Sequence, residues 1–340
     1  MIPATLRTLL RTAALLLVLT GILGTAPVRA ASGDAGPWGS SFFPNVPLVT
    51  QDGKQVRFFD DLIKGKVVAI NFIFTGCSAA CGMETARLRQ VQDLLGDRMG
   101  KDVFFVSISI DPENDTPEAL KAYAAKFNVG PGWTWLTGKQ KDIDLLRTRL
   151  GLYMPPINKD KPNEIDHDIA VVIGNQATGR WMKASPMENP EILATQLGSW
   201  LHNWKVQPAK ANPKYENAPV RLPELSKGED LFRTRCVTCH TVGQPGKETA
   251  KTIGPDLTFV TRVRQRGWLV RWMKEPDVML SEKDPIATAL YEKYNKLAMP
   301  NLRLKENEIE QILSFLEQGS AAYSAAQAKV TPAAAPAAKK

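Results

Sequence analysis

Cys236-Val237-Thr238-Cys239-His240 is the stretch that decides how the C-terminal part of this chain is built. Two thiols separated by two residues and followed directly by an imidazole form the attachment signature of a c-type haem. The thiols form thioether bonds to the haem vinyl groups, and the adjacent His is placed to ligate the iron. The chain has only four Cys and three His, so this order rarely arises by chance. The sequence therefore predicts one covalent haem c here.

Residues 225–319 around this motif resemble the class I cytochrome c family. A helix is predicted over 226–235, leading into Cys236, and Gly254-Pro255-Asp256-Leu257 matches the family's loop after the haem-binding turn. The resemblance implies a mostly α domain. It also implies that the Pro255 carbonyl accepts a hydrogen bond from the His240 ring, a contact that fixes the orientation of the ligand.

Met299, in Ala298-Met299-Pro300-Asn301, is predicted to be the second axial ligand of the iron. The family places its Met ahead of a final helix, here expected over 306–316. Two other methionines are weaker candidates, because Met273 lies in an amphipathic stretch typical of a core and Met279 follows Glu-Pro-Asp-Val. His/Met ligation leaves no open coordination site and raises the reduction potential. We therefore expect this domain to transfer single electrons rather than to bind oxygen.

The region 41–205 alternates strand-like and helix-like segments. Two near-continuous β-rich runs are typical of strands buried on both faces. Thr116 and Pro117 together indicate the start of a helix. The expected strands are 67–74, 103–110 and 169–174, and the expected helices include 83–95 and 190–204. This β-α-β-α order predicts an α/β domain with a mostly parallel sheet.

Cys77 and Cys81 lie in Phe74-Thr75-Gly76-Cys77-Ser78-Ala79-Ala80-Cys81-Gly82, between a buried strand and a helix. A thiol at a helix N-terminus loses its proton more easily, because it lies at the positive end of the helix dipole. A spacing of four residues brings both sulfur atoms to one side of a helical turn. The two residues are thus predicted to be a redox-active pair that either chelates one metal ion or closes a disulfide.

At these residues the chain resembles the Sco/SenC family, thioredoxin-like proteins that carry copper to the CuA centre of cytochrome c oxidase. The match includes the Cys-x-x-x-Cys loop, Ser109-Ile110-Asp111-Pro112-Glu113-Asn114-Asp115-Thr116-Pro117, Trp135-Leu136-Thr137-Gly138 and Asp166-His167. The resemblance implies that Cys77, Cys81 and His167 bind one copper ion. Two soft thiolates suit Cu(I), and an added imidazole also tolerates Cu(II).

The chain departs from this family where Pro commonly follows each Cys, because Ser78 and Gly82 stand there instead. A thiol-disulfide oxidoreductase therefore remains an alternative. Such enzymes usually carry Cys-x-x-Cys, so the extra residue favours a metal. A peroxiredoxin is disfavoured, because Thr75 lies two residues before Cys77 rather than three.

Three functions are compatible with two such sites on one chain. The first is a metallochaperone that passes copper to the copper-bearing subunit of cytochrome c oxidase or to another acceptor, while the haem handles the one-electron redox state of copper. The second is a periplasmic thiol-disulfide oxidoreductase acting on target cysteines. The third is an electron carrier whose thioredoxin-like half is a docking scaffold.

The number of electrons favours the first function. A disulfide takes two electrons, and dithiol couples of this fold lie at about −120 to −270 mV, below most His/Met haems. We therefore expect the haem to serve copper, and a separate thiol reductant protein to reduce the cysteine pair.

The N-terminal segment 1–30 is predicted to be a signal peptide or a retained membrane anchor. Arg7 and Arg11 precede an apolar run of signal-peptide length over 13–24, and Val28-Arg29-Ala30 offers small residues for cleavage. The body of the protein is then exported to the periplasm, where a retained anchor would associate it with the membrane. Residues 31–40 and 206–224 are predicted linkers, and the Ala/Pro/Lys-rich segment 320–340 is predicted to be a disordered tail.

The formal net charge of +8 falls by three when the segment 1–30 is removed. The remaining charge is mild and does not point to nucleic acid as a partner. A basic stretch contains Arg262, Arg264, Arg266, Arg271 and Lys274. We interpret it as a solvated face with one residue near a haem propionate; docking on an acidic partner is the alternative.

Overall fold

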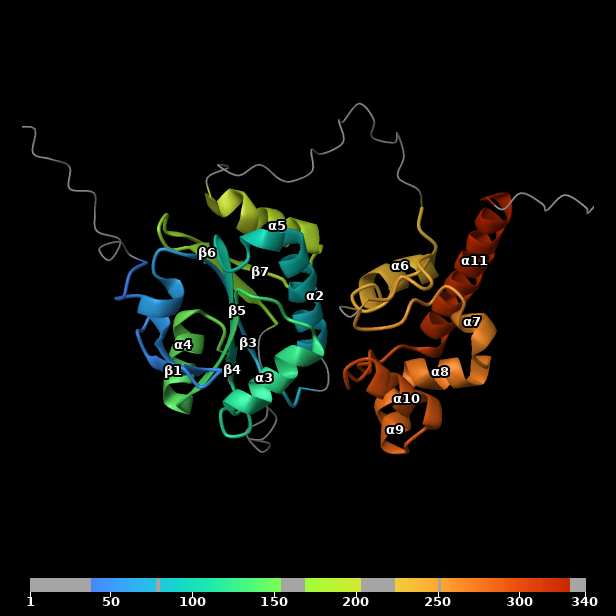
Figure 1. Cartoon of the computed structure of the whole chain (residues 1–340), viewed down its shortest axis with the longest axis horizontal. Coiled ribbons are helices and arrows are strands. Elements are labelled where there is room, and N and C mark those ends of the chain that lie inside the picture. Colours follow the sequence, from blue (N-terminus) through green and yellow to red (C-terminus); the bar gives the residue numbers. More distant parts are fainter. Residues whose placement is uncertain (1–37, 78–79, 154–168, 203–223, 250–251, 331–340) are drawn as a thin grey trace, which may run out of the picture.

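The computed structural model describes residues 38–77, 80–153, 169–202, 224–249 and 252–330. These residues form a layered α/β domain followed by a helical domain (Figure 1). The two predicted fold classes are therefore both confirmed.

One mixed sheet forms the centre of the N-terminal domain. Among the described residues it has seven strands in the order β2-β1-β5-β4-β3-β6-β7. Their bounds are β1 (Pro47–Thr50), β2 (Gln55–Arg57), β3 (Val67–Ile73), β4 (Val103–Ser109), β5 (Trp133–Gly138), β6 (Val171–Asn175) and β7 (Arg180–Ala184). The ladders β3–β4 and β4–β5 are parallel, and the others are antiparallel. The prediction of a mostly parallel sheet is therefore wrong, since strands joined by short turns, such as β1 to β2 and β6 to β7, must pair antiparallel.

Helices cover both faces of this sheet, because alternate residues of its central strands are apolar on both sides. Val68 and Ile70 of β3 pack in the cluster that includes the π-helix η1 (Phe58–Ile63) and the helix α4 (Gln140–Arg149). Val67 and Ala69 face the opposite cluster. That second layer contains α2 (Ala80–Leu95), α3 (Pro117–Lys126) and α5 (Pro190–Gly198). The short 3-10 helices are η2 (Gly96–Arg98) and η3 (Trp200–His202).

The C-terminal domain is built from helices that surround a separate apolar core. They are α6 (Lys227–Arg235), α7 (Val260–Val263), α8 (Arg266–Lys274), α9 (Pro276–Ser281), α10 (Pro285–Lys293) and α11 (Glu306–Val330). The first and last helices touch closely at Gly228, where an added Cβ would overlap the backbone oxygen of Gln311 and lie 3.0 Å from the Cβ of Phe315. This contact fixes the direction in which α6 delivers the cysteine motif.

Helix α11 extends to Val330, beyond the predicted end at 316. Residues 320–330, expected to be disordered, are thus helical, because Ala has the highest intrinsic helix propensity and five of these eleven residues are Ala. Tyr323 of this extension packs on Phe259, with ring centroids 5.6 Å apart. Within the described part of the chain, no helix is long and apolar enough to cross a membrane.

Candidate functional site

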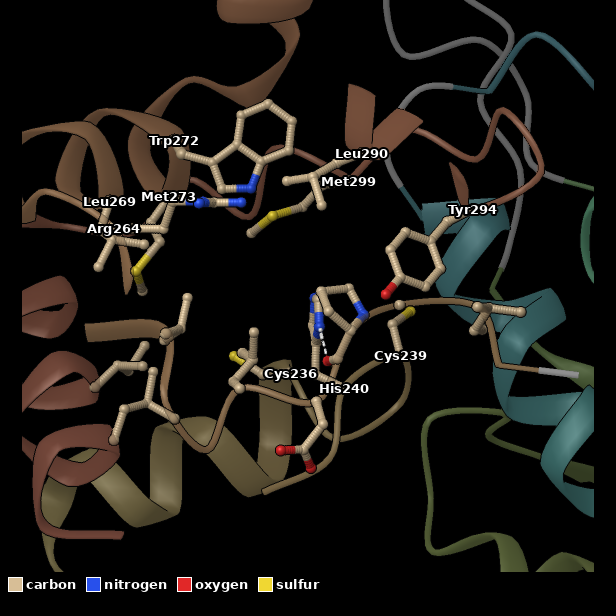
Figure 2. A pocket seen from close by; sticks show the side chains of 18 of the residues that line it. Cys236, Cys239, His240, Arg264, Leu269, Trp272, Met273, Leu290, Tyr294 and Met299 are labelled. Atoms are coloured by element: carbon tan, nitrogen blue, oxygen red, sulfur yellow. Dashed lines mark hydrogen bonds between the residues drawn. The ribbon is translucent and has the colours of Figure 1, made fainter. Parts of the chain in front are cut away.

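The first site is the turn that follows α6. Ser226 caps the start of this helix by accepting a hydrogen bond from the Glu229 N–H, and Cys236 is its C-cap. The backbone N–H groups of Cys239 and His240 both donate to the carbonyl of Cys236, at 3.1 and 3.0 Å. This tight turn brings Cys236, Cys239 and His240 to one side of a cavity (Figure 2).

The two cysteines of this turn are free thiols. Burial raises the pKa of Cys236 to about 12 and the pKa of Cys239 to about 11. Both sulfur atoms are therefore neutral at neutral pH and are not held as a structural disulfide.

The imidazole of His240 is held in one tautomer. Its Nδ1 lies 3.0 Å from the carbonyl oxygen of Pro255; a carbonyl only accepts hydrogen bonds, so Nδ1 carries the proton and Nε2 keeps its lone pair. The contact predicted for Pro255 is thereby confirmed. Burial lowers the pKa of His240, which favours the neutral ring that a metal ion requires.

Asp256 holds together the loop behind His240. Its carboxylate accepts hydrogen bonds from the Thr241 hydroxyl at 2.7 Å, the Gln244 N–H at 3.1 Å and the Thr258 N–H at 3.0 Å. Burial by itself raises the pKa of Asp256, but the hydrogen bonds from Thr258 and Thr241 lower it on balance. The sequence analysis did not identify this role, although Asp256 lies in the quoted Gly-Pro-Asp-Leu loop.

The cavity above the turn has a volume of about 270 Å³ and mostly apolar walls. Figure 2 shows Met299 on the side opposite His240, with Trp272 beside it. Of the two weaker candidates, Met273 also lines the cavity, whereas Met279 is buried elsewhere. Two thiols, a neutral imidazole, a thioether across from it and apolar walls fit a covalently attached haem c.

The basic stretch is mostly neutralised within the domain. Arg266 pairs with Glu310 and Glu317, and Arg271 pairs with Glu275 and Glu282. Lys274 pairs with Glu306. Arg264, by contrast, lines the cavity (Figure 2). These contacts agree with the interpretation as a solvated face that directs one residue toward the haem pocket.

The second site lies between β3 and α2. Cys77 and Cys81 form a disulfide with their Cα atoms 5.9 Å apart, and the Cys81 N–H points at the Cys77 sulfur at 3.3 Å. Cys81 is fully buried and Cys77 half-buried. His167, the predicted third copper ligand, and Ser78 lie outside the described residues. Within the described ranges no cluster of three His, Cys, Asp or Glu side chains is arranged to hold a metal ion.

Asp115 supports the thiol loop from below. This fully buried carboxylate accepts hydrogen bonds from the backbone N–H and the hydroxyl of Thr75, two residues before Cys77, and from the Ser109 hydroxyl. The sequence analysis quoted Asp115 within the family stretch but did not assign it a role. Its burial and its hydrogen bonds, which identify the role, depend on the fold and are not visible in the sequence.

A buried polar chain lies between the sheet and the helix that begins at the thiol pair. The Asn71 amide donates to Glu84 at 2.9 Å and accepts from the Ser107 hydroxyl at 2.6 Å. The Trp133 indole donates to Ser107 at 2.8 Å. Glu84 is one helical turn beyond Cys81, so this chain anchors the first turn of α2 to strands β3, β4 and β5.

Comparison with known families supports both halves of this description. The family model described as SCO1/SenC matches residues 39–202, and the one described as Cytochrome c matches residues 225–320. The SCO1 protein homolog of Bacillus subtilis is 40% identical over 28% of this chain and 48% of its own length. A SCO2-like protein of Rickettsia felis is 30% identical over 43% of this chain and 72% of its own length.

One solved structure is similar to the cytochrome domain of this chain, and another is similar to its thioredoxin-like domain. The cytochrome c domain of the pp3183 protein from Pseudomonas putida is 50% identical, with a TM-score of 0.27 over 32% of this chain and 99% of that chain. Arabidopsis thaliana ScoI, solved with copper bound, is 27% identical, with a TM-score of 0.37 over 44% of this chain and 90% of that chain.

The fold and the two cysteine sites define a thioredoxin-like thiol domain joined to a c-type cytochrome domain, and such a cytochrome domain implies haem c. The chain belongs to the SCO1/SenC family. Its matched segment spans about half the length of the Bacillus subtilis relative.

Proposed function

We propose that this protein is a copper chaperone of the cell envelope that serves assembly of the CuA centre of cytochrome c oxidase. The observation that carries the proposal is the proximity of Cys77, just before α2, and Cys81, in its first turn, with Cα atoms 5.9 Å apart. When reduced, two thiolates at this spacing can bind one Cu(I) ion, the soft cation that sulfur ligands prefer. His167 is the proposed third ligand.

The cytochrome domain is proposed to hold one haem c through thioether bonds to Cys236 and Cys239. His240 and Met299 are the proposed axial ligands. A haem with these ligands supplies or accepts single electrons, which matches the one-electron change between Cu(I) and Cu(II). The residues of the chain provide the rest: apolar walls exclude water, and the Pro255 carbonyl orients the His240 ring.

Export to the periplasm, with segment 1–30 as signal peptide or anchor, is part of this proposal. The proposed partners are the copper-bearing subunit of the oxidase, or another copper acceptor, and a thiol reductant protein that opens the Cys77–Cys81 disulfide. The family match supports the oxidase as the destination.

A thiol-disulfide oxidoreductase is the second candidate function. The observation that favours it is the Cys77–Cys81 disulfide itself, the oxidised state that such an enzyme would cycle through. In this function the pair would exchange with target cysteines and would not need His167.

An anaerobic Cu(II) titration of the thiol-reduced, haem-loaded protein, with its haem kept ferric, tests the two functions against each other. We expect a thiolate-to-copper charge-transfer band that saturates at one equivalent. Cys77→Ser and His167→Ala should each remove it or weaken it strongly. His202→Ala is the matched control, since it removes a different histidine of the same domain and should leave the band intact.

The opposite result has a defined meaning. Oxidation of Cys77 and Cys81 to the disulfide without any charge-transfer band would reject the chaperone and favour the oxidoreductase. Copper binding that is as tight in Cys77→Ser as in the wild type would remove the proposed site altogether.

A further inference from the structure

Part of the outer face of α2, at Gln90, contacts the haem-attachment turn. The side-chain amide of Gln90 donates to the carbonyl oxygens of Val237 and Thr238, at 3.4 and 3.2 Å. These are the two residues between the attachment cysteines. One turn earlier on the helix, Arg87 donates to the Gln90 amide oxygen at 3.2 Å, which orients that amide for its two acceptors.

A second contact between the domains comes from different elements. Asn295, in the turn after α10, donates from its amide to the carbonyl oxygen of Lys126 at the end of α3, at 3.3 Å. Two hydrogen-bonded links at separate places restrict rotation of one domain against the other, which a single link would allow.

Apolar contacts lie between these polar links. Cys239, Ile253 and Leu297 of the cytochrome domain pack against the core cluster formed by α2, α3 and α5. Figure 2 shows Cys239 and Tyr294 on the side of the cavity nearest α2. An apolar centre with a polar rim is the usual composition of a specific protein interface.

Arg87 gives this interface an electrostatic character. Only 8% of its surface is exposed, although a buried cation is costly unless its surroundings compensate it. The helix that begins at the thiol pair thus places a cation beside the attachment turn.

We propose that α2 carries an intramolecular docking surface whose partner is the chain's own haem-attachment turn, residues 236–240. Gln90 and Asn295 fix the register of this contact, and Arg87 supports Gln90 from within the interface. The surface orients the cytochrome domain toward the helix that starts beside Cys81; along the axis, Cys81 and Gln90 are about 14 Å apart. The proposal does not rest on copper binding, because it is defined by contacts between protein atoms.

Paramagnetic shifts in the full-length, haem-loaded protein test this docking. In a ¹⁵N-labelled sample, the amide shifts of the thioredoxin-like domain are compared between the ferric and ferrous states. If the domains dock, amides along 84–94 and at the end of α3 will shift between these states, because unpaired electron density on the iron acts only on nearby nuclei.

The double variant Gln90→Glu with Asn295→Asp should abolish these shift differences. A carboxylate at position 90 cannot donate to the carbonyls of Val237 and Thr238 and repels them. Asp at 295 keeps the left-handed backbone conformation of Asn (φ 57°) but loses the donor to Lys126. Gln318→Glu, the same exchange on an exposed part of α11, is the matched control and should keep the wild-type shifts.

Two outcomes would overturn the proposal: no shift differences along α2 in the wild type, or undiminished differences in the double variant. If the double variant does not fold, the single variant Gln90→Glu is measured with the same two criteria. Copper binding is titrated on the same samples. Its absence in the wild type would reject the proposed chaperone and leave the docking surface standing, because the shifts do not depend on copper.

Discussion

The two cysteine loops of this protein are each organised by one aspartate, and the two aspartates differ in burial. Asp115 is fully buried and accepts three hydrogen bonds, from the N–H and hydroxyl of Thr75 and from the Ser109 hydroxyl. Asp256 also accepts three hydrogen bonds, in the loop after His240, but it is only half-buried. Water can replace lost partners at Asp256 and not at Asp115. A carboxylate with three hydrogen bonds should therefore contribute more stability in the thioredoxin-like domain than in the cytochrome domain.

The surroundings of the two cysteine pairs differ in the same direction. Cys77 and Cys81 lie over a buried polar chain that begins at Glu84, whereas Cys236 and Cys239 border an apolar cavity. A polar frame suits a pair that must gain and lose protons, electrons or a metal ion. An apolar frame suits the permanent thioether attachment proposed for Cys236 and Cys239.

Asp115→Asn should have the largest effect on stability. An amide at this position cannot accept all three hydrogen bonds, and its own N–H groups would face the donors of Thr75 and Ser109. We expect a loss of about 3 kcal/mol in the unfolding free energy of the thioredoxin-like domain, because hydrogen bonds to a buried charge are among the strongest in proteins. Hydrogen exchange at β3 and β4, followed by mass spectrometry, measures this loss in the thioredoxin-like domain separately from the cytochrome domain.

The control for this variant is Asp111→Asn, four residues earlier in the same stretch. Asp111 is half-buried, and its carboxylate accepts a hydrogen bond from the Asn114 amide at 2.9 Å. Its exchange should cost well under half of the Asp115 effect. Equal losses in the two variants would contradict the view that burial of the carboxylate sets the magnitude.

Gly228→Ala should disturb the contact between α6 and α11, which positions Cys236 and Cys239. The new Cβ would fall on the backbone oxygen of Gln311, so α6 must move away from α11, at a cost of about 1–3 kcal/mol. Gly267→Ala in α8 meets no neighbouring atom and should be neutral or stabilising. Thermal unfolding followed by haem absorption compares the two. A Gly228→Ala protein as stable as the wild type would show that the helix crossing is not tight.

The core of this architecture could be predicted from the sequence because its signals are local. The runs at 67–74 and 103–110 become β3 and β4, and Thr116 caps α3 as expected. The turn holding Cys236, Cys239 and His240 also has the predicted contact with Pro255. For the strands and the cap, neighbouring residues determine the conformation, whereas the Pro255 contact was implied by the resemblance to the cytochrome c family.

What could not be predicted depends on residues distant in sequence. The antiparallel ladders β1–β5 and β3–β6 join strands that are about ninety and one hundred residues apart. Asp115 and Asp256 act through side chains brought together by the fold. Gln90 contacts residues almost 150 positions away in the sequence. No periodicity or motif spacing predicts a contact at that distance. The extension of α11 was missed because Ala-rich composition was interpreted as a tail rather than as a helix former.

Asp256→Asn should have a smaller effect, and one that depends on pH. The folded-state pKa of Asp256 is lowered, so its stabilisation is present above the ordinary carboxyl pKa of about 4 and is lost as the pH falls through the folded value. At neutral pH we expect the variant to lose about 1 kcal/mol. Below the folded pKa, wild type and variant should converge, which an acid titration of the haem absorption measures. A constant difference at all pH values would reject this account.

Gly82→Ala, next to the thiol pair, should have the smallest effect on stability. Gly82 follows Cys81 in the first turn of α2, where the family commonly has Pro, and an added Cβ would meet only the Phe127 ring at 3.9 Å, an ordinary contact. Ala reduces the freedom of the unfolded chain, so we expect a gain of about 0.5–1 kcal/mol, measured by chemical unfolding.

The control for this substitution lies just beyond the other end of the same helix. Gly96 has a φ of +54°, which strains any residue with a Cβ, so Gly96→Ala should lower stability although no atom crowds it. Opposite signs for the two substitutions would mean that Gly96 is required by the backbone and Gly82 is not. A loss of stability at both positions would contradict this account, because neither the backbone conformation nor the surroundings of Gly82 require glycine.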